Sequence, residues 1–401
     1  MLLEILYNTT LKNEGIFMIA VVGAGPAGLS CASMLSKFGL SVELFERDKL
    51  GGTCLNYGCR YINALKDVSD TIESLNSIKG KKHTLNDILS LSDLHNKIDN
   101  IHEVMRENSL ESLTKKGIVV KFKEFKEEYE KDYDYVVYAT GYDYPTSFEG
   151  VECAKYNEIP YIRKLPKKVL VIGGGTVAAE YASIFSTFGS DVTVYVRSKF
   201  LKMIEDDEVR EYIINNISNF KITSDINVMR KMLNDNEYFN VLAVGGTPKY
   251  KTNEFLQVDG KNNVYACGDA VKGGYTPIAN REGKLVAENI YNAIKGIPLK
   301  KMTYGINIST IRMPMNISVL GKQTLNFKTT YNRPGSGYYF KKSEKRGMNR
   351  IYYENGKVVG AIAMTPATDV SPYFLQYIKG IDVYNEFLEV YPSNDPFYWQ
   401  V

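Results

Sequence analysis

Residues 18–47, MIAVVGAGPAGLSCASMLSKFGLSVELFER, read as an apolar strand, a glycine-rich turn, a helix and a second strand with an acid at its end. This order is typical of dinucleotide-binding folds, in which the start of the helix faces a pyrophosphate. Gly23 allows the tight turn, Gly25 lets the pyrophosphate approach the backbone, and Gly28 permits close packing of helix on strand. Glu46 can accept hydrogen bonds from ribose hydroxyls. The stretch therefore predicts a dinucleotide site.

The chain carries the same pattern a second time, as KVLVIGGGTVAAEYASIFSTFGSDVTVYVR at residues 168–197. Gly173 and Gly175 take the places of the first two glycines of the first copy, and Ala178 replaces the third. Two strand–turn–helix–strand units predict two nucleotide sites on one chain, in an α/β fold.

The second copy ends differently from the first. Val196 occupies the place of Glu46, and Arg197 and Lys199 follow. Losing a ribose-binding carboxylate and gaining cations is how such folds accommodate a 2′-phosphate. The second site is therefore predicted to take NADPH in preference to NADH, with a merely solvated Arg197 as the alternative.

Between the two copies lies GGTCLNYGC, residues 51–59, in which a glycine pair precedes two cysteines. It follows a strand-like run and leads into a helical segment, so Cys54 is expected near a helix start, where the local field stabilises a thiolate. Two reduced thiols in an intracellular protein are more often inert than reactive. Cys54 and Cys59 are therefore candidates for a redox-active pair. Whether they are reactive has to be judged from the motifs around them.

Composition limits the other possibilities. A chain of 401 residues, 44% of them apolar, is long enough for two or three globular domains. Its 49 basic and 46 acidic residues are interspersed, which predicts no nucleic-acid partner. Five scattered cysteines do not form a secreted disulfide framework, so a cytoplasmic location is expected. No apolar run reaches the roughly 18 residues of a membrane helix, and residues 1–17 read as an extension or a mis-assigned start.

Residues 62–116 alternate apolar and charged positions at helical spacing and predict one or two long amphipathic helices. All three histidines lie here, at His83, His95 and His102, without the cysteines or carboxylates of a metal site. We expect them to be solvated helix residues, and no metal is predicted.

Two later stretches complete the pattern. DYDYVVYATGYDYP, residues 132–145, predicts a strand that ends in a turn, and VYACGDAVKGGYTPIAN, residues 264–280, predicts a strand that ends in Gly-Asp before a helix. With the two glycine motifs and GGTCLNYGC, they resemble in this order the FAD-dependent pyridine nucleotide-disulfide oxidoreductases, the family of dihydrolipoamide dehydrogenase, glutathione reductase and mercuric reductase. The resemblance extends from about Met18 to the end of the chain.

The resemblance implies an α/β fold with two Rossmann-like dinucleotide-binding domains, for FAD and NAD(P), and a C-terminal α+β dimerisation domain. It places the FAD-binding domain at residues 18–148 and 259–308, the NAD(P)-binding domain at 149–258 and the interface domain at 309–401. It also implies a homodimer.

FAD and NADPH (or NADH) are the cofactors that the resemblance implies, and it assigns residues to each site. The catalytic positions are Cys54, Cys59, Glu180 and Tyr391. The FAD positions are Gly23, Gly25, Pro26, Ala27, Gly28, Glu46, Arg47, Gly52, Thr53, Asn63, Ala139, Thr140, Gly141, Gly268, Asp269, Thr276, Pro277 and Ala279. The NAD(P) positions are Gly173, Gly175, Thr176, Val177, Ala178, Val196, Arg197, Lys199, Gly245 and Gly246.

The resemblance further implies an electron path from NAD(P)H through FAD to a Cys54–Cys59 disulfide, and on to a disulfide or related thiol acceptor. Cys59 is expected to be the flavin-proximal, charge-transfer thiol, and Cys54 the thiol that attacks the substrate.

The chain departs from the family pattern just after the second cysteine. Tyr61, Ile62 and Asn63 stand where relatives have Pro-Ser-Lys, so the lysine that relatives pair with a glutamate is missing. Glu180, at the glutamate position, is retained without that partner. Arg60 is a candidate replacement for the lost positive charge.

A second departure lies at the C-terminus. Tyr391, Pro392 and Ser393 stand where thiol-using relatives have His-Pro-Thr, and Pro396 takes the place of the glutamate that orients the histidine. Tyrosine titrates near pH 10, against about 6.5 for histidine, so Tyr391 would be a poor base at neutral pH. This departure disfavours efficient oxidation of a dithiol such as dihydrolipoamide.

Two other functions remain open at this point. A flavin enzyme could send electrons directly to oxygen, a quinone or a metal ion, with the cysteine pair as a relay or a relic. A flavin-bearing redox sensor without turnover would also explain the missing lysine and histidine.

Overall fold

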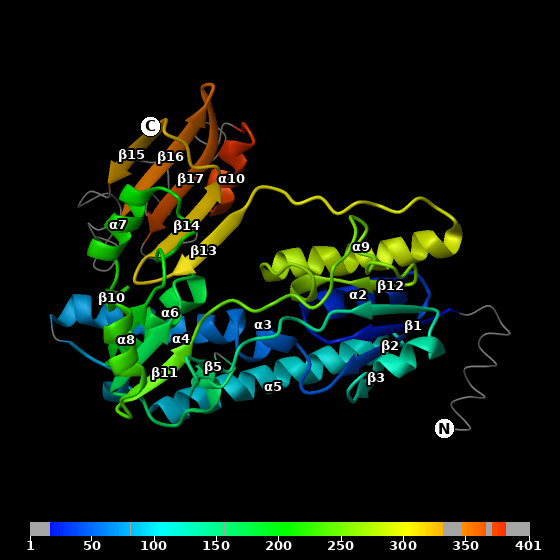
Figure 1. Ribbon diagram of the computed structural model, residues 1–401, viewed down its shortest axis with the longest axis horizontal. Helices are drawn as coiled ribbons and strands as arrows, with labels where there is room; N and C mark the ends of the chain where they lie inside the picture. The colour runs from blue at the N-terminus through cyan, green and yellow to red at the C-terminus, as the bar shows by residue number, and fades with distance from the viewer. Residues whose placement is uncertain (1–16, 81, 156, 332–346, 366–370, 382–401) are drawn as a thin grey trace. The chain divides into compact units, whose positions relative to one another are not determined.

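The computed structural model describes residues 17–80, 82–155, 157–331, 347–365 and 371–381. These residues form two compact units, each of which is described by itself (Figure 1). The first unit contains residues up to 61, 95–145 and 245–303, and the second contains residues 62–94, 146–244 and those from 304 onward. Each unit is therefore assembled from segments that are far apart in the sequence.

The first unit is built on a parallel sheet with the strand order β12-β4-β1-β2-β3. Every residue of β1 is buried, as expected for a parallel strand covered on both faces. Met18 of β1 pairs with Ser41 of β2, and Ile19 pairs with Tyr135 of β4. The strands are β1 (Met18–Val22), β2 (Ser41–Glu46), β3 (Val119–Phe122), β4 (Tyr135–Tyr138) and β12 (Val264–Ala266).

Helices α2 (Pro26–Lys37) and α9 (Thr276–Lys295) pack side by side in this unit (Figure 1). A glycine permits their close approach, since a Cβ added at Gly283 of α9 would lie 2.1 Å from the carbonyl oxygen of Ala27 in α2. The start of α2 therefore lies against the part of α9 around Gly283.

The prediction of one or two long helices over residues 62–116 corresponds to two, α4 (Cys59–Lys79) and α5 (Leu91–Lys115). The short helix α3 (Gly52–Asn56) precedes α4. The chain passes from the first unit to the second within α4 and returns to the first unit within α5.

The prediction that the histidines are solvated helix residues is wrong. His95 and His102 are 3% and 5% exposed, and their rings lie 5.7 and 6.5 Å from the Tyr61 ring, centroid to centroid. His83 is not helical and hydrogen-bonds to Asn76 from between α4 and α5. The pattern of apolar residues does not reveal such burial, because an imidazole packs against an aromatic ring as a partly apolar group.

The second unit holds another parallel sheet, with the strand order β10-β9-β8-β11-β7. Helix α6 (Thr176–Phe188) follows β8 through the second glycine turn, so the predicted strand–turn–helix–strand repeat is present. The strands are β7 (Ala154–Lys155), β8 (Lys168–Ile172), β9 (Asp191–Tyr195), β10 (Lys221–Thr223) and β11 (Tyr238–Leu242); helices α7 (Asp207–Asn216) and α8 (Ile226–Leu233) and a hairpin of β5 (Ser147–Phe148) and β6 (Val151–Glu152) complete this part.

An antiparallel sheet with the strand order β13-β14-β17-β16-β15 also belongs to the second unit. Asn355 and Gly356 connect β16 to β17 with φ angles of +51° and +74°, as a two-residue Asn-Gly hairpin turn requires. The elements are β13 (Ile308–Arg312), β14 (Asn316–Gly321), β15 (Phe327–Tyr331), β16 (Met348–Glu354), β17 (Lys357–Thr365) and α10 (Ser371–Ile378).

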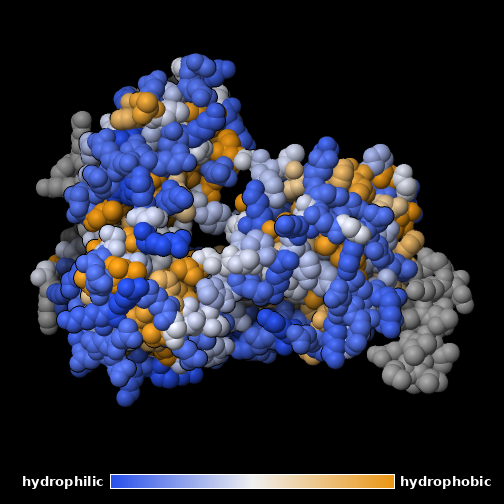
Figure 2. All heavy atoms as spheres, in the orientation of Figure 1, coloured by the Kyte–Doolittle hydropathy of each residue, from blue (hydrophilic) through white to orange (hydrophobic). Residues whose placement is uncertain are grey.

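The predicted fold class, with two Rossmann-like units and an α+β part, is confirmed. On the face shown in Figure 2, hydrophilic residues cover most of the surface and apolar residues gather in small groups. In the part of the chain that the structure describes, no helix is both long and apolar enough to cross a membrane.

Candidate active site

Two cysteines and a threonine meet in the first unit. Cys54 lies in α3, Cys59 is the first residue of α4, and both carry free thiols. The Thr276 hydroxyl, at the first residue of α9, donates to Cys54 Sγ over 3.1 Å and lies 3.6 Å from Cys59 Sγ. Segments that begin three helices therefore converge on the sulfur pair.

The two thiols have opposite pKa shifts. A hydrogen bond from Cys54 lowers the pKa of Cys59 to about 6, helped by Thr276 and opposed by burial and by the charge of Asp269. The same hydrogen bond and burial raise the pKa of Cys54, although Thr276 and Arg60 oppose the rise. These opposite shifts favour the negative charge of the reduced pair on Cys59 and its proton on Cys54.

This charge distribution differs from the sequence-based expectation that a helix start would stabilise a thiolate at Cys54. Helix α3 has 5 residues, whereas α4, which begins at Cys59, has 21. The hydrogen bond runs from Cys54 to Cys59, and this direction favours the charge on Cys59.

Asn56, a side chain without a predicted role, holds residues 50–59, the cysteine loop, through hydrogen bonds. Its Nδ2 donates to the carbonyl oxygens of Leu50 and Gly52, at 3.1 and 2.9 Å. Its Oδ1 accepts a 2.8 Å hydrogen bond from Nη1 of Arg106, which is 7% exposed. The sequence offered one sign of this role, the asparagine inside GGTCLNYGC, because an amide that becomes buried must form hydrogen bonds.

The glycine turn after β1 lies against the cysteine loop. A Cβ added at Gly52 would lie 2.8 Å from the Cα of Gly25. Gly23 has a φ of +100°, and a Cβ there would lie 2.4 Å from the carbonyl oxygen of Ala139. A Cβ at Gly28 would lie 1.9 Å from the carbonyl oxygen of Gly23. Side chains at these positions would strike neighbouring backbone, so the glycines allow the turn to stay tight at the start of α2.

Polar groups around this turn fit a dinucleotide. Oε2 of Glu46 accepts from the N–H of Ala24 at 2.8 Å, and Oε1 accepts from the N–H of Asp48 at 2.9 Å, which ties the carboxylate to the turn. The Thr140 hydroxyl oxygen is buried and has no hydrogen-bond partner among the described residues. A buried hydroxyl left without a partner costs stability, so this position suits a ligand that supplies one.

A second carboxylate lies near the start of α9. Asp269 is in the single helical turn at residues 268–270, and its Oδ1 accepts from the N–H of Gly274 at 3.2 Å. Burial raises the pKa of the Asp269 carboxyl. Gly268 has a φ of +68°, and a Cβ there would lie 2.9 Å from the Cβ of Ala27, so this turn packs on the start of α2.

The second glycine turn has the same construction in the second unit. Gly173 has a φ of +139°, and a Cβ there would lie 2.3 Å from the carbonyl oxygen of Ala243. Gly175 precedes the first residue of α6, Thr176, and a Cβ at Gly175 would meet no described atom within 4 Å. The start of α6 is thus open to a ligand.

The two cations predicted to select NADPH have different surroundings. Nζ of Lys199 lies 2.8 and 3.2 Å from the carboxylate oxygens of Asp207, so its charge is already paired. Arg197 is exposed and makes no hydrogen bond or ion pair to another residue that the structure describes. Val196, in the place of the first motif's glutamate, is buried.

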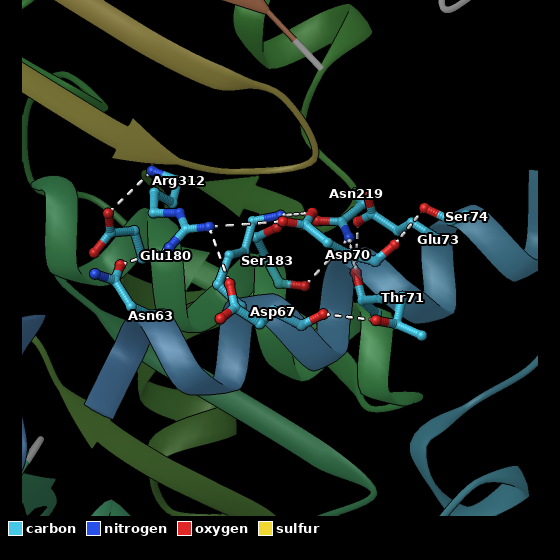
Figure 3. A network of polar contacts seen from close by, with 12 residues as sticks. Asn63, Asp67, Asp70, Thr71, Glu73, Ser74, Glu180, Ser183, Asn219 and Arg312 are labelled. Carbon is cyan, nitrogen blue, oxygen red and sulfur yellow. Dashed lines mark hydrogen bonds and ion pairs between the residues drawn. The ribbon is translucent and has the colours of Figure 1, made fainter. Parts of the chain in front are cut away.

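An arginine joins Glu180 to Asn63 in the second unit (Figure 3). Glu180 is 8% exposed, and its Oε1 accepts from the backbone N–H of Arg312 at 3.0 Å. Nη1 of Arg312 donates to Oδ1 of Asn63 at 2.7 Å, and Nη2 lies 3.4 Å from Asp67 and 3.7 Å from Asp70. A cation from β13 therefore lies beside the position where the family pattern has a lysine. Sequence reasoning missed Arg312, since no local motif marks it.

The predicted site residues divide cleanly between the units. The predicted FAD residues all lie in the first unit except Asn63, and the predicted NAD(P) residues all lie in the second unit except Gly245 and Gly246. Tyr391, with Pro392, Ser393 and Pro396, lies outside the described residues.

A protein-family model described as pyridine nucleotide-disulphide oxidoreductase matches residues 17–247. The chain belongs to this family. The resemblance drawn from the motifs is thereby confirmed, and members of the family use FAD and NAD(P)H.

Known relatives match this oxidoreductase over different lengths. It is 50% identical over 383 residues to the protein MJ0636 of Methanocaldococcus jannaschii, which covers 95% of this chain and 96% of the relative. It is 24% identical over 216 residues to dihydrolipoyl dehydrogenase of Bacillus subtilis, and 26% identical over 228 residues to soluble pyridine nucleotide transhydrogenase of Mycobacterium tuberculosis. Those two matches cover 48% and 51% of this chain and 46% and 48% of the relatives, so the likeness spans about half of each enzyme.

A solved structure, LpdA from Mycobacterium tuberculosis, superposes on this oxidoreductase with a TM-score of 0.70. The match covers 94% of this chain and 97% of LpdA at 14% sequence identity. At that identity the likeness shows a shared fold alone.

Proposed function

We propose that this oxidoreductase passes electrons from NAD(P)H, with NADPH preferred, to a redox-active disulfide between Cys54 and Cys59, and from there to a disulfide or related thiol acceptor. The observation that supports this most is the contact of one hydroxyl, that of Thr276, with both sulfurs. The pKa shifts of the reduced pair favour a thiolate on one of the two sulfurs, and a thiolate is the nucleophile of thiol–disulfide exchange.

The residues present suit the family's cofactors. In the first unit, the turn from Gly23 to Gly25, the Glu46 carboxylate and the Thr140 hydroxyl would hold FAD. When bound, FAD relays two electrons from NAD(P)H to the disulfide. In the second unit, the start of α6 would bind the pyrophosphate of NADPH, and Arg197 its 2′-phosphate.

The cysteines carry out the remaining steps. Reduction breaks the Cys54–Cys59 bond and takes up two electrons and one proton, leaving a thiol on Cys54 and a thiolate on Cys59. Cys54 first passes its proton to the Cys59 thiolate. The Cys54 thiolate so formed attacks one sulfur of the acceptor disulfide, and the other acceptor sulfur leaves as a thiolate that takes the proton from Cys59. Cys59 attacks Cys54 in the mixed disulfide, which restores the bond and releases the second acceptor sulfur as a thiolate. Thr276 lies within reach of both sulfurs and can donate to whichever is charged.

Anaerobic two-electron reduction of the flavin-loaded protein tests the proposal. We expect a long-wavelength charge-transfer absorption between the Cys59 thiolate and the flavin. Cys59→Ser should abolish this absorption. Cys54→Ser cannot form the disulfide and should show the absorption before any reduction, because the Cys59 thiolate and oxidised flavin are then present together. The control Cys153→Ser, at a buried cysteine of the second unit, should behave as the wild type does. A wild-type protein without the absorption, or a Cys59→Ser variant that retains it, contradicts the proposal.

An acceptor screen with the same protein separates the other functions. Turnover of a small disulfide that is lost in both Cys54→Ser and Cys59→Ser supports the proposal. Turnover of oxygen, a quinone or a metal ion that survives both substitutions identifies direct use of the flavin instead. Slow reduction by NADPH with no turnover of any acceptor identifies a redox sensor.

A further inference from the structure

Tyr142 contacts the loop that carries Thr276 to the cysteine pair. It directly follows the predicted FAD residues Ala139, Thr140 and Gly141, is half-buried, and has no role in the site assigned above. Its hydroxyl donates to the carbonyl oxygen of Lys272 over 2.8 Å. Both residues lie in the first unit.

Two glycines leave room for the Tyr142 side chain. A Cβ added at Gly273 would lie 1.2 Å from the Tyr142 hydroxyl oxygen, and one at Gly246 would lie 2.5 Å from the Tyr142 Cβ. The backbone beneath the ring is paired, because Asp143 and Thr247 exchange hydrogen bonds of 3.2 and 2.9 Å. The tyrosine is therefore held on one side by a paired backbone segment and touches the loop with the other.

The loop leads from this contact directly to the sulfurs. It is held at Lys272 by Tyr142 and at Gly274 by Asp269, whose Oδ1 accepts the Gly274 N–H. Two residues after Gly274, α9 begins at Thr276, the residue whose hydroxyl touches both cysteines. The position of that hydroxyl thus depends on how the loop is held.

We propose that Tyr142 is a positioning residue for the cysteine pair, which holds the loop at residues 271–275 so that the Thr276 hydroxyl reaches both sulfurs. This proposal rests on the proposed function of the pair. The groups that act on the charge of Cys59 are Cys54 from α3, Thr276 from α9 and Asp269 from the turn before α9, with Arg60 acting on Cys54. Displacing the loop removes Thr276 from the sulfurs and leaves Cys54 in place.

The test measures the ionisation of Cys59 in the reduced protein, from the pH dependence of its alkylation by iodoacetamide. Tyr142→Ala should move the Cys59 midpoint upward by about one pH unit, the effect of one hydrogen bond to a charged group. Thr276→Val should produce a shift of the same size. The double variant should shift no further than either single variant, because both changes remove the same hydrogen bond.

Two further variants sharpen the result. Tyr142→Phe keeps the ring and loses the hydroxyl, so it should shift the midpoint upward by less than Thr276→Val, and it serves even where Tyr142→Ala does not fold. Asp143→Asn removes the neighbouring ion pair with Lys249, 2.8 Å long, and should leave the midpoint unchanged. An unchanged midpoint in the Tyr142 variants, or additive shifts in the double variant, would overturn the proposal. Because alkylation needs neither flavin nor acceptor, this outcome is independent of the charge-transfer test.

Discussion

Cys59 receives a hydrogen bond from Cys54, and this contact sets a measurable pH dependence. Alkylation of Cys59 in the reduced protein should rise through a midpoint of about 6 and then level off, because the thiolate is the nucleophile. Cys54→Ala removes the hydrogen bond and should move the midpoint to higher pH. Cys31, whose pKa is raised by burial, should stay unmodified in the same samples. A wild-type midpoint near that of an ordinary thiol, about 8.5, would contradict this prediction.

Arg197 is the residue on which the choice of coenzyme should depend. Arg197→Glu is expected to weaken NADPH binding more than NADH binding, since a carboxylate repels the 2′-phosphate that only NADPH carries. Dissociation constants for both coenzymes measure the ratio. Lys199→Gln is the matched control and should change that ratio less, because Lys199 is already paired with Asp207. Equal weakening of both coenzymes by Arg197→Glu would remove the argument for NADPH.

At the scale of the elements, one arginine joins strand β13 to helices α4 and α6. Its guanidinium contacts Asn63, Asp67 and Asp70, which share one face of α4 because they are spaced at four and three residues. Its backbone N–H binds Glu180 of α6. Asp70 also pairs with Lys66 of the same helix, so Arg312 adds a second positive charge, from a strand, to this face of α4 (Figure 3).

Because Arg312 lies beside Asn63, a positively charged side chain at residue 63 should destabilise the fold. Asn63→Lys should lower the free energy of unfolding, because it places a second cation beside Arg312. In the Arg312→Ala background the same substitution should cost less, since the introduced lysine can then pair with Asp67. We expect a coupling of about 0.5–3 kcal/mol between the two changes in urea unfolding. Asn63→Gln is the neutral control, and additive effects of Asn63→Lys and Arg312→Ala would contradict the prediction.

For the whole molecule, the family resemblance predicts a homodimer. Light scattering of the purified protein should give twice the mass of one chain. Adding a reducing agent should not change this mass, because the predicted homodimer contains no disulfide bond between its subunits. A mass of one chain over the concentrations used for turnover would contradict this prediction. The domain boundaries predicted at residues 148, 258 and 308 likewise stay predictions.

The sequence by itself determined the α/β class, the two nucleotide-binding repeats, the family and the candidate cysteine pair. These depend on local requirements, such as a glycine where the backbone takes a positive φ, as at Gly23 and Gly173. Only the tertiary structure decided that the Thr276 hydroxyl contacts both sulfurs and that Arg312 lies beside Asn63, 249 residues away in the chain. It also decided that His95 and His102 are buried. Hydrogen-bond partners and burial arise when distant segments pack together, and neighbouring residues in a sequence carry no record of that packing.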